Sequence, residues 1–464
     1  MRSFWSMALL ALLVSGCAAV GPDYVRPEIA APAAWNVEYQ AAADLANVQW
    51  WKRFNDPVLD SLIETAVRGN LDLKSATAKV DQYLGVLDTT RSQYFPQISA
   101  GFSPSIQRSG NISTESYQAT VNATWELDLW GKIRRSSEAA QAQIAGSEAG
   151  RRAVLMSVVA NVASGYITLR GLDRQLEIAR DTEKAYAESL KLFRLRFQYG
   201  TISQLELSQA ESNYEAAHQA IPNYESQIRQ QENLISLLLG RAPGPIPRGK
   251  TLDELIPPGV PAGLPSQLLE RRPDIIQAEQ SLIAANAEIG VARAAYFPSI
   301  TLTGALGAAS SDIGKLFGPG TALASAGGQL LAPLLNFGKI SGQVKQAEAQ
   351  QQQALYQYQQ TILTAFREVE DALIKTSKGR EQLEAQKRQV QSLQEYARLA
   401  RLQFEAGTSS YLQVLDADRS LFTGKLDKTQ THYNLLVSLV SVYKAMGGGW
   451  VGEADKLTEP TPRK

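Results

Sequence analysis

Two stretches of this sequence decide the fold: SQYFPQISAGFSPSIQ at 92–107 and AAYFPSITLTGALG at 294–307. In each of them a helix-like stretch ends at a Tyr-Phe-Pro triplet, and a stretch of alternating apolar and polar residues follows. Proline disfavours helical backbone in the residue before it, so the triplet marks a helix end. Alternation with a period of two is typical of a strand with one apolar and one polar face. The sequence therefore predicts the same helix-to-strand switch twice, at Tyr94 and at Tyr296, 202 residues apart.

Other matching stretches indicate that this switch belongs to an internal duplication. LWGKI at 129–133 matches NFGKI at 336–340, at an offset of 207 residues. RFQYGTISQLEL from Arg196 matches QFEAGTSSYLQV from Gln403 at the same offset. A fixed spacing of this size favours two copies of one structural unit over an array of short repeats. The change of offset lies between the YFP and GKI motifs, so we expect the extra residues in the second strand hairpin.

A β-hairpin is expected in each unit, over about 98–127 and about 299–331. In the first, apolar residues occupy the even positions from Ile98 to Ile106, and the odd positions are polar or glycine. Pro104 interrupts this strand and indicates a bulge or a sheet edge. The return strand of the second hairpin, near 321–331, shows the weakest alternation.

A long helix is expected after each hairpin, over 131–199 and 338–406. Apolar residues there recur mostly at steps of three and four, the spacing of coiled coils. At about 1.5 Å per residue each helix is about 100 Å long, more than one globular domain needs. Gly200 and Gly407 suit a helix end followed by a tight turn. Shorter return helices then follow.

The N-terminus has the pattern of a secretory signal. A basic residue and a short apolar run precede VSGC, which ends at Cys17. Small residues directly before a cysteine resemble the bacterial lipobox, in which the cysteine is lipidated after cleavage. An ordinary signal peptide with a chance cysteine is the alternative. Ala18 follows, where an Asp usually retains lipoproteins in the inner membrane, so the resemblance implies the outer membrane.

Composition argues against several function classes. Lys plus Arg and Asp plus Glu both number 46 in the 464 residues, so no basic surplus favours nucleic acid. One Cys and two His argue against a zinc cluster or a disulfide framework. Neither a phosphate-binding P-loop nor a G-x-S-x-G motif occurs, so the chain is not expected to be an enzyme.

Several ordered motifs resemble the TolC-like outer membrane factors. They are WELDLWGKIRRSSEAA, LLERRPDIIQAE, AAYFPSITLTG and FEAGTSSYLQVLDADRSLF, and they span nearly the whole mature chain. The lipobox favours the NodT-like lipoprotein branch, which serves resistance-nodulation-division efflux systems. The resemblance implies a mainly α fold with a small membrane β part, assembled as a trimer. Its twelve-stranded β-barrel would be continuous with a periplasmic α-helical barrel.

Oligomerisation is also expected from the strand count alone. Four strands are too few to close a membrane barrel, and an open strand edge in lipid is not viable. Three copies would supply twelve strands. Aromatic residues beside the expected strands are candidates for an interfacial girdle, with ordinary buried aromatics as the alternative. They are Tyr94, Phe95, Trp125, Trp130, Tyr296, Phe297 and Phe337.

The resemblance places a periplasmic gate at the second helical turn. Leu412, Asp416 and Arg419 match the family constriction, and their spacing puts them on one helix face. The first half carries uncharged Leu205, Gln209 and Ser212 in their place. The alternative is a solvated intrahelical Asp416–Arg419 ion pair. Contact with the adaptor is expected, by resemblance alone, at the tips Gly200, Thr201, Gly407 and Thr408.

The function implied is the exit duct of a tripartite efflux system. It would be a homotrimer anchored in outer membrane lipid and extending into the periplasm. Its partners would be a periplasmic adaptor protein and an inner-membrane resistance-nodulation-division pump. No cofactor or metal is expected, but Cys17 would carry a diacylglycerol and an N-acyl chain. A type I protein-secretion duct and a lipid-anchored periplasmic coiled-coil scaffold remain alternatives.

The expected organisation runs in the following order. It comprises a signal peptide at 1–16, a lipid-anchored extended segment with a short helix at 17–70, and a first repeat at 71–241 with its return helix at 202–239. A Pro/Gly-rich linker and equatorial segment at 242–270, a second repeat at 271–448 with its return helix at 409–446, and a flexible tail at 449–464 complete it.

Overall fold

The computed structural model describes residues 19–28, 35, 49–110, 112–257, 259 and 269–447. The expected signal peptide, Cys17 and the expected tail lie outside these described residues. The chain divides into two compact units, each built from several chain segments. Unit 1 includes Thr77–Ala149 and Ile275–Thr361, and unit 2 includes Gly150–Asp274 and Ile362–Lys464.

Each half of the chain contains the same series of elements. The first half has α3 (Leu71–Ser92), β1 (Gln97–Ser109), β2 (Ile112–Glu126), α4 (Lys132–Gln198) and α5 (Gln204–Leu238). The second half has α7 (Pro273–Ala294), β3 (Ser299–Ser310), β4 (Ala322–Leu331), α8 (Lys339–Glu405) and α9 (Tyr411–Ala445). Equivalent helices have equal lengths: 22 residues in α3 and α7, 67 in α4 and α8, and 35 in α5 and α9. The fold is mainly α with a small β part, as the sequence predicts.

Short elements lie before, between and within these repeats. The 3-10 helix η3 (Trp50–Phe54) and helix α2 (Pro57–Gly69) precede the first repeat. The 3-10 helix η4 (Leu252–Glu254) lies in the expected linker, and η5 (Ile313–Lys315) lies between β3 and β4. The change of offset between the halves therefore coincides with an extra turn in the second hairpin.

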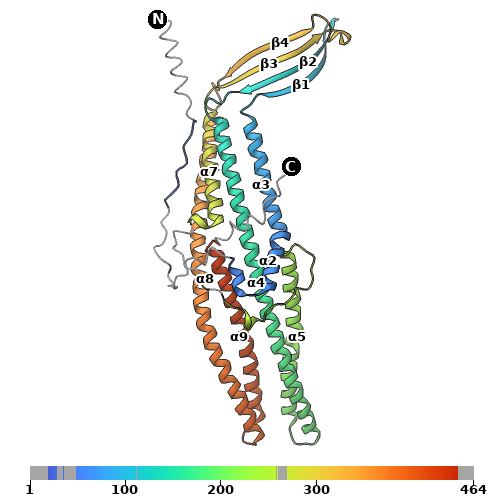
Figure 1. Cartoon of the computed structure of the whole chain (residues 1–464), viewed down its shortest axis with the longest axis vertical. Helices are drawn as coiled ribbons and strands as arrows, with labels where there is room; N and C mark the ends of the chain where they lie inside the picture. Colours follow the sequence, from blue (N-terminus) through green and yellow to red (C-terminus); the bar gives the residue numbers. More distant parts are fainter. Residues whose placement is uncertain are drawn as a thin grey trace. The chain divides into compact units, whose positions relative to one another are not determined.

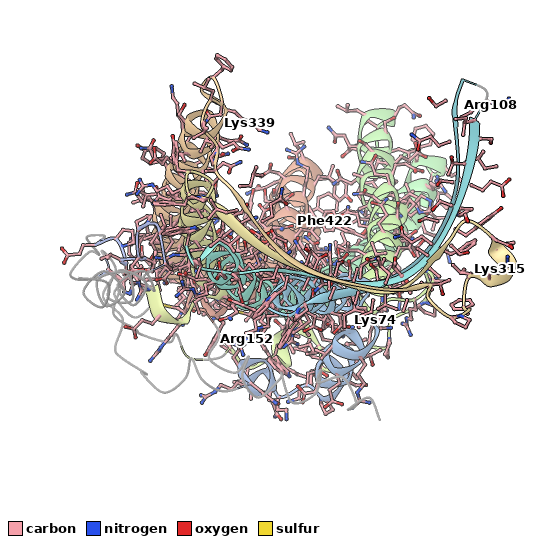
Figure 2. All side chains as sticks on the ribbon, turned by 90° about the horizontal axis from the view of Figure 1, so that it is seen from above. Lys74, Arg108, Arg152, Lys315, Lys339 and Phe422 are labelled. Carbon is pink, nitrogen blue, oxygen red and sulfur yellow. The ribbon has the colours of Figure 1, made fainter. Side chains whose placement is uncertain are left out.

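The four strands form one antiparallel sheet in the order β1-β2-β3-β4 (Figure 1). Pairing of β1 with β2 continues without a bulge through Pro104, which lies opposite Tyr117. Pro104 therefore belongs to an edge strand, where a missing N–H is tolerated. Apolar side chains of β1 are exposed, with Ile98 at 73% and Ile106 at 71%. Arg108 and Lys315 lie toward one end of the sheet, away from Lys339 at the start of α8 (Figure 2).

Both Tyr-Phe-Pro triplets end their helices with the same backbone pattern. The N–H groups of Tyr94 and Phe95 donate to Arg91 and Ser92, and those of Tyr296 and Phe297 donate to Arg293 and Ala294, at 3.0–3.1 Å. These bonds reach back three residues, so each helix tightens before proline ends it. The triplet therefore marks the helix-to-strand switch, as predicted.

Residues 19–28 lie extended on unit 1, and we call them the N-terminal strap. The Arg135 side chain, only 7% exposed, pairs with Asp23 at 2.7 Å and donates to the carbonyls of Val20 and Gly21. The Asn286 amide donates to the Pro22 carbonyl at 2.9 Å. Buried donors thus fix residues 20–23 of the strap on unit 1.

Unit 2 has its own core around aromatic rings and a buried carboxylate. Trp50 stacks on Tyr443 with ring centroids 5.3 Å apart. The Asp56 side chain accepts hydrogen bonds from the Tyr166 hydroxyl at 2.8 Å and the Lys250 N–H at 2.9 Å. Because Lys250 belongs to the expected linker, the described part of that linker is held against the core.

One helix in the described chain, α4, has an 18-residue window apolar enough to cross a membrane. Most of that window is buried inside the protein, so the core of the protein accounts for its apolar character.

Candidate functional site

The two helical hairpins end in the same type of turn. Gly200 has φ 70° and Gly407 has φ 74°, the left-handed backbone that glycine adopts at low cost. The N–H and hydroxyl of Thr201 both donate to the Arg196 carbonyl, and those of Thr408 both donate to the Gln403 carbonyl. All four tip residues predicted from the sequence, Gly200, Thr201, Gly407 and Thr408, are exposed.

The helices after these turns begin differently. Ser203 and Glu206 form a capping box at the start of α5, in which each side chain bonds the other residue's backbone N–H. Ser410, the equivalent residue of α9, makes no side-chain capping bond. An N-cap bond stabilises a helix end by about 0.5–2 kcal/mol. The second hairpin therefore has the less firmly fixed turn.

The three predicted gate residues share one exposed face of α9. Leu412 is 59% exposed, and Asp416 and Arg419 are also exposed. The opposite face, with Val414 and Ala417, is buried in the tip core. The structure therefore brings the gate residues together on the surface of α9, as their spacing of four and three predicts.

Asp416 and Arg419 do not form the intrahelical ion pair considered as the alternative. The Asp416 carboxylate instead accepts a hydrogen bond from the Tyr396 hydroxyl of α8 at 3.3 Å. Within the described part of a single chain, no carboxylate lies within ion-pair distance of the Arg419 guanidinium. Arg419 is thus available for a contact with another chain.

A small aromatic core lies beneath this face. The ring of Phe193 on α4 lies 3.8 Å from Tyr411 on α9 and 6.2 Å from Phe404 on α8, measured between centroids. The Arg196 guanidinium lies over the Phe404 ring at 5.7 Å. Side chains of both hairpins therefore share one core at the tips.

In each hairpin, one ion pair that the sequence did not predict connects the two helices. Arg194 pairs with Glu211 at 3.3 Å, and Arg401 pairs with Asp418 at 3.0 Å. The second pair lies 207 residues after the first, so the duplication offset would have revealed the equivalence of the two pairs.

The Asp418 carboxylate of the tip is largely shielded from solvent, with 12% of its side chain accessible. Burial raises the pKa of Asp418, and the charge and hydrogen bond of Arg401 oppose this shift. Burial also raises the pKa of Tyr411 to about 12, so this hydroxyl stays neutral.

The first hairpin carries no charge at the matching positions. Leu205 is 68% exposed, Ser212 is exposed and Gln209 is half-buried. Any charge-dependent contact at these positions must therefore come from the second hairpin.

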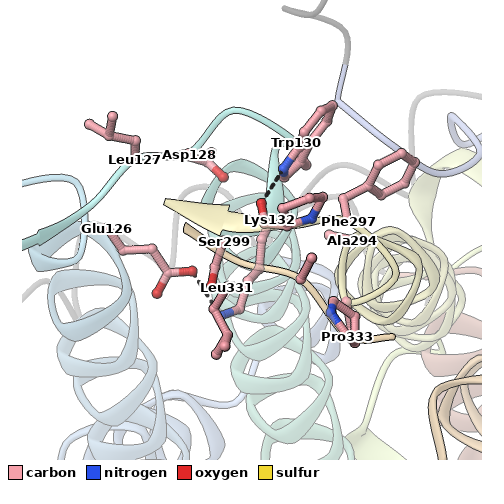
Figure 3. A pocket seen from close by; sticks show the side chains of 13 residues that line it. Glu126, Leu127, Asp128, Trp130, Lys132, Ala294, Phe297, Ser299, Leu331 and Pro333 are labelled. Atoms are coloured by element: carbon pink, nitrogen blue, oxygen red, sulfur yellow. Dashed lines mark hydrogen bonds and ion pairs between the residues drawn. The ribbon is translucent and has the colours of Figure 1, made fainter. Parts of the chain in front are cut away.

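A second candidate region is a pocket of ≈ 400 Å³ at the strand ends of unit 1 (Figure 3). The Trp130 indole N–H donates to the Pro298 carbonyl at 2.7 Å, and its ring stacks on Phe297 with centroids 4.7 Å apart. Of the other predicted girdle residues, Phe95, Trp125, Tyr296 and Phe337 are exposed, and Tyr94 is half-buried. The described residues contain no cluster of His, Cys, Asp or Glu that could hold a metal ion.

Comparison with known proteins gives a family match to both halves of the chain. The model described as "Outer membrane efflux protein" matches residues 62–241 and 264–448. These two matches correspond to the two structural repeats.

Curated relatives align along nearly the whole chain. The toluene efflux pump outer membrane protein TtgC of Pseudomonas putida is 37% identical, over 99% of this chain and 98% of its own length. The cation efflux system protein CusC of Escherichia coli is 36% identical, over 95% and 97%. The probable outer membrane lipoprotein SilC of Salmonella typhimurium is 34% identical, over 95% and 97%.

Solved structures agree with these relatives. A CusC crystal structure has a TM-score of 0.84 at 35% identity and covers 93% of this chain and 100% of its own. The open state of the MtrE outer membrane channel of Neisseria gonorrhoeae has a TM-score of 0.85 at 30% identity and covers 93% and 99%.

Proposed function

This chain belongs to the outer membrane efflux protein family, and on that premise we propose that three copies form a passive exit duct closed at the tip of the second hairpin. The protein is an outer membrane channel of a tripartite efflux system. Channels of this family work with a periplasmic adaptor and an inner-membrane pump. For this chain we assign a resistance-nodulation-division pump as the inner-membrane partner.

The sheet supports assembly as a homotrimer. β1 and β4 each pair with one neighbour, so a single chain leaves two unpaired strand edges. Unpaired backbone groups cost several kcal/mol each in lipid, and membrane barrels have at least eight strands. Three copies supply twelve strands and leave no edge.

The exposed face of α9 supports the assignment of the gate. In a trimer, Leu412 would form an apolar ring that resists wetting, and Asp416 would form a ring of carboxylates. Arg419 has no partner in its own described chain, so it is free to bridge to a neighbouring copy. The weakly capped turn before α9 allows this hairpin to move more readily than the first.

Single-channel conductance in planar bilayers tests the gate. The double variant Asp416→Ala, Arg419→Ala removes both charged rings and the contacts between copies that would hold the gate closed. We therefore expect a higher conductance than that of the native channel. The matched control is Gln209→Ala, Ser212→Ala at the equivalent positions of the first hairpin, which should leave conductance unchanged. A correctly assembled trimer with native conductance in the Asp416/Arg419 variant would contradict the assignment.

Lipidation of Cys17 is part of the proposal, and the strap supports it. The Val20 N–H donates to the Trp130 carbonyl at 3.0 Å, at the junction of β2 and α4. Cys17 precedes Val20 by three residues in the sequence. Acyl chains on Cys17 would then enter the membrane beside the strand ends. Mass spectrometry of the mature N-terminus should find the added acyl mass, and an unmodified Cys17 would refute lipidation.

We propose that another polypeptide of the efflux system selects the substrate. Relatives named for toluene efflux and for cation efflux are 37% and 36% identical to this chain. Sequence similarity therefore does not distinguish between these two substrate classes. The tips Gly200, Thr201, Gly407 and Thr408 would meet the adaptor. Cross-linking from cysteines at Thr201 and Thr408 to the adaptor, with exposed Thr114 on β2 as the control, tests that contact.

A further inference from the structure

Two aromatic side chains near the ends of the sheet are exposed and stack on no other ring among the residues that the structure describes. Phe337, just before α8, is 98% exposed, and Phe95, just before β1, is 68% exposed. They lie beside the two strands that each have an unpaired edge, β4 and β1. Phe337 also has φ 47°, a backbone conformation that is uncommon outside glycine.

The duplicated fold already contains a packed version of this pair. Trp130 lies 207 residues before Phe337, and Phe297 lies 202 residues after Phe95. Trp130 and Phe297 stack within one chain, at the junction where β2 pairs with β3. The two exposed phenylalanines are therefore the repeat equivalents of a stacked pair.

We propose that a second copy of this chain completes the pair, with Phe337 of one copy packing on Phe95 and Pro96 of the next. The proposal rests on the homotrimer proposed above and specifies its sheet interface. In this arrangement β4 lies against β1 of the neighbouring copy as β2 lies against β3 within one chain. The contact is purely apolar, since Phe337 has no equivalent of the Trp130 N–H that donates to Pro298.

The same equivalence fixes the strand register between copies. Thr124 of β2 lies opposite Thr303 of β3. The equivalent of Thr124, 207 residues later, is Leu331, and the equivalent of Thr303, 202 residues earlier, is Gly101. We therefore expect Leu331 to lie opposite Gly101 of the next copy. Likewise, the hydrogen bond from the Leu127 N–H to the Ile300 carbonyl becomes one from Leu334 to the neighbour's Ile98.

Backbone directions on the two open edges agree with this register. The Ala309 N–H donates to the Thr321 carbonyl, so odd-numbered residues of β4 bond to β3 and even-numbered ones face the open edge. The odd-numbered Leu127 bonds to β3, so the even-numbered residues of β2 bond to β1. These lie opposite odd-numbered residues of β1, so odd-numbered residues of β1 bond to β2 and even-numbered ones face outward. Leu334 and Ile98 are both even, as direct pairing requires. Pro104 is also even, so its missing N–H lies on the edge between copies, outside the β1–β2 ladder.

Disulfide cross-linking tests the register in the assembled, detergent-purified protein. Opposite residues of an antiparallel pair lie within disulfide range, whereas residues displaced by two along a strand lie about 7–8 Å apart. We expect Leu331→Cys with Gly101→Cys to give covalent dimers and trimers under oxidation. Leu331→Cys with Ser99→Cys or with Ser103→Cys should leave mainly monomers on non-reducing gels. The native protein controls for Cys17, its single cysteine.

The outcomes separate this proposal from the function it rests on. Stronger cross-linking by a displaced pair, or none in a protein that sediments as a trimer, would overturn the register and leave the duct intact. A protein that sediments as a monomer and cross-links with no pair would overturn both.

The aromatic contact has its own test in the heat stability of the trimer on gels. Phe337→Ala and Phe95→Ala should each lower the temperature of trimer dissociation, and the double variant should lower it no further than the larger single effect. Phe317→Ala, at an 84% exposed residue between β3 and β4, is the matched control and should have no effect. Fully additive losses for Phe337 and Phe95 would show that the two rings do not touch and would refute the contact.

Discussion

At the scale of single residues, the Tyr166 hydroxyl is the connection most open to measurement. It donates to Asp56 at 2.8 Å and accepts from the Gly249 N–H at 2.8 Å, so it joins α2, α4 and the linker. Burial raises the pKa of Tyr166, and the nearby Asp56 carboxylate raises it further, so the hydroxyl stays a donor at all physiological pH values. Tyr166→Phe removes the hydroxyl that donates to the buried Asp56 carboxylate, and loss of a partner costs a buried polar group about 1–3 kcal/mol. We expect thermal unfolding followed by circular dichroism to shift to lower temperature.

Tyr224→Phe is the matched control for this change. The Tyr224 ring is half-buried, and its hydroxyl makes no hydrogen bond within the described residues. Loss of that oxygen should therefore leave the unfolding temperature nearly unchanged. Equal shifts for the two variants would mean that the hydrogen bonds of the Tyr166 hydroxyl add nothing to the stability of the protein.

Asp418 gives the tip a predictable pH dependence. Because burial raises its folded pKa above the ordinary value of about 3.9, the folded tip binds a proton more tightly than the unfolded chain does. This contribution is fully present below about pH 3.9 and is lost as pH rises through the folded pKa. Arg401 and Lys425 oppose the shift, and the neighbouring Tyr186 and Tyr411 stay neutral in this range.

Hydrogen exchange of the α8–α9 tip, corrected for intrinsic rates, measures this effect. Asp418→Asn removes the titrating group, so its protection should change less between pH 4 and pH 6 than that of the native protein. Glu405→Gln, which alters an exposed tip carboxylate, should keep the native slope. A native slope in Asp418→Asn would assign the pH dependence to another group.

At the scale of elements, the two hairpin turns differ in how their return helices begin. Ser203→Ala breaks the capping box of α5 and should destabilise its first turn by about 1 kcal/mol, which corresponds to roughly fivefold faster amide exchange there. Ser410→Ala removes no capping bond, so exchange at the start of α9 should stay within error of the native rate. The opposite order would contradict the assignment of the second hairpin as the weakly fixed one.

The elements also show what the sequence could predict and why the rest was out of reach. Apolar residues at steps of three and four, ended by Gly200 and Gly407, predicted the long helices at 131–199 and 338–406, and the structure has Lys132–Gln198 and Lys339–Glu405. β4 was the least clear strand because ALASAGGQLL places Gly and Leu on both faces. Its pairing with β3 supplies the order that the pattern lacks. Likewise, the spacing of Leu412, Asp416 and Arg419 predicted one face of α9. The Tyr396–Asp416 bond depends on how α8 and α9 align, which spacing within one helix does not contain.

At the scale of the whole molecule, the gate proposal predicts the ion selectivity of the channel. Three copies of Asp416 and three of Arg419 would place rings of opposite charge at the same constriction, one helical turn apart. Asp416→Asn leaves the cationic ring, so the permeability of cations relative to anions should fall. Arg419→Gln leaves the carboxylates, so this ratio should rise. Reversal potentials in a potassium chloride gradient across a planar bilayer measure both changes.

Opposite signs are the informative result, because a change in pore width alone affects cations and anions alike. Gln209→Ala in the first hairpin is the control, since the matching positions there carry no charge and should leave the reversal potential unchanged. If both charged variants shift the potential in the same direction, the two side chains do not line one constriction. The exposed α9 face would then be an ordinary solvated surface, and the closure of the duct would have to lie elsewhere along the chain.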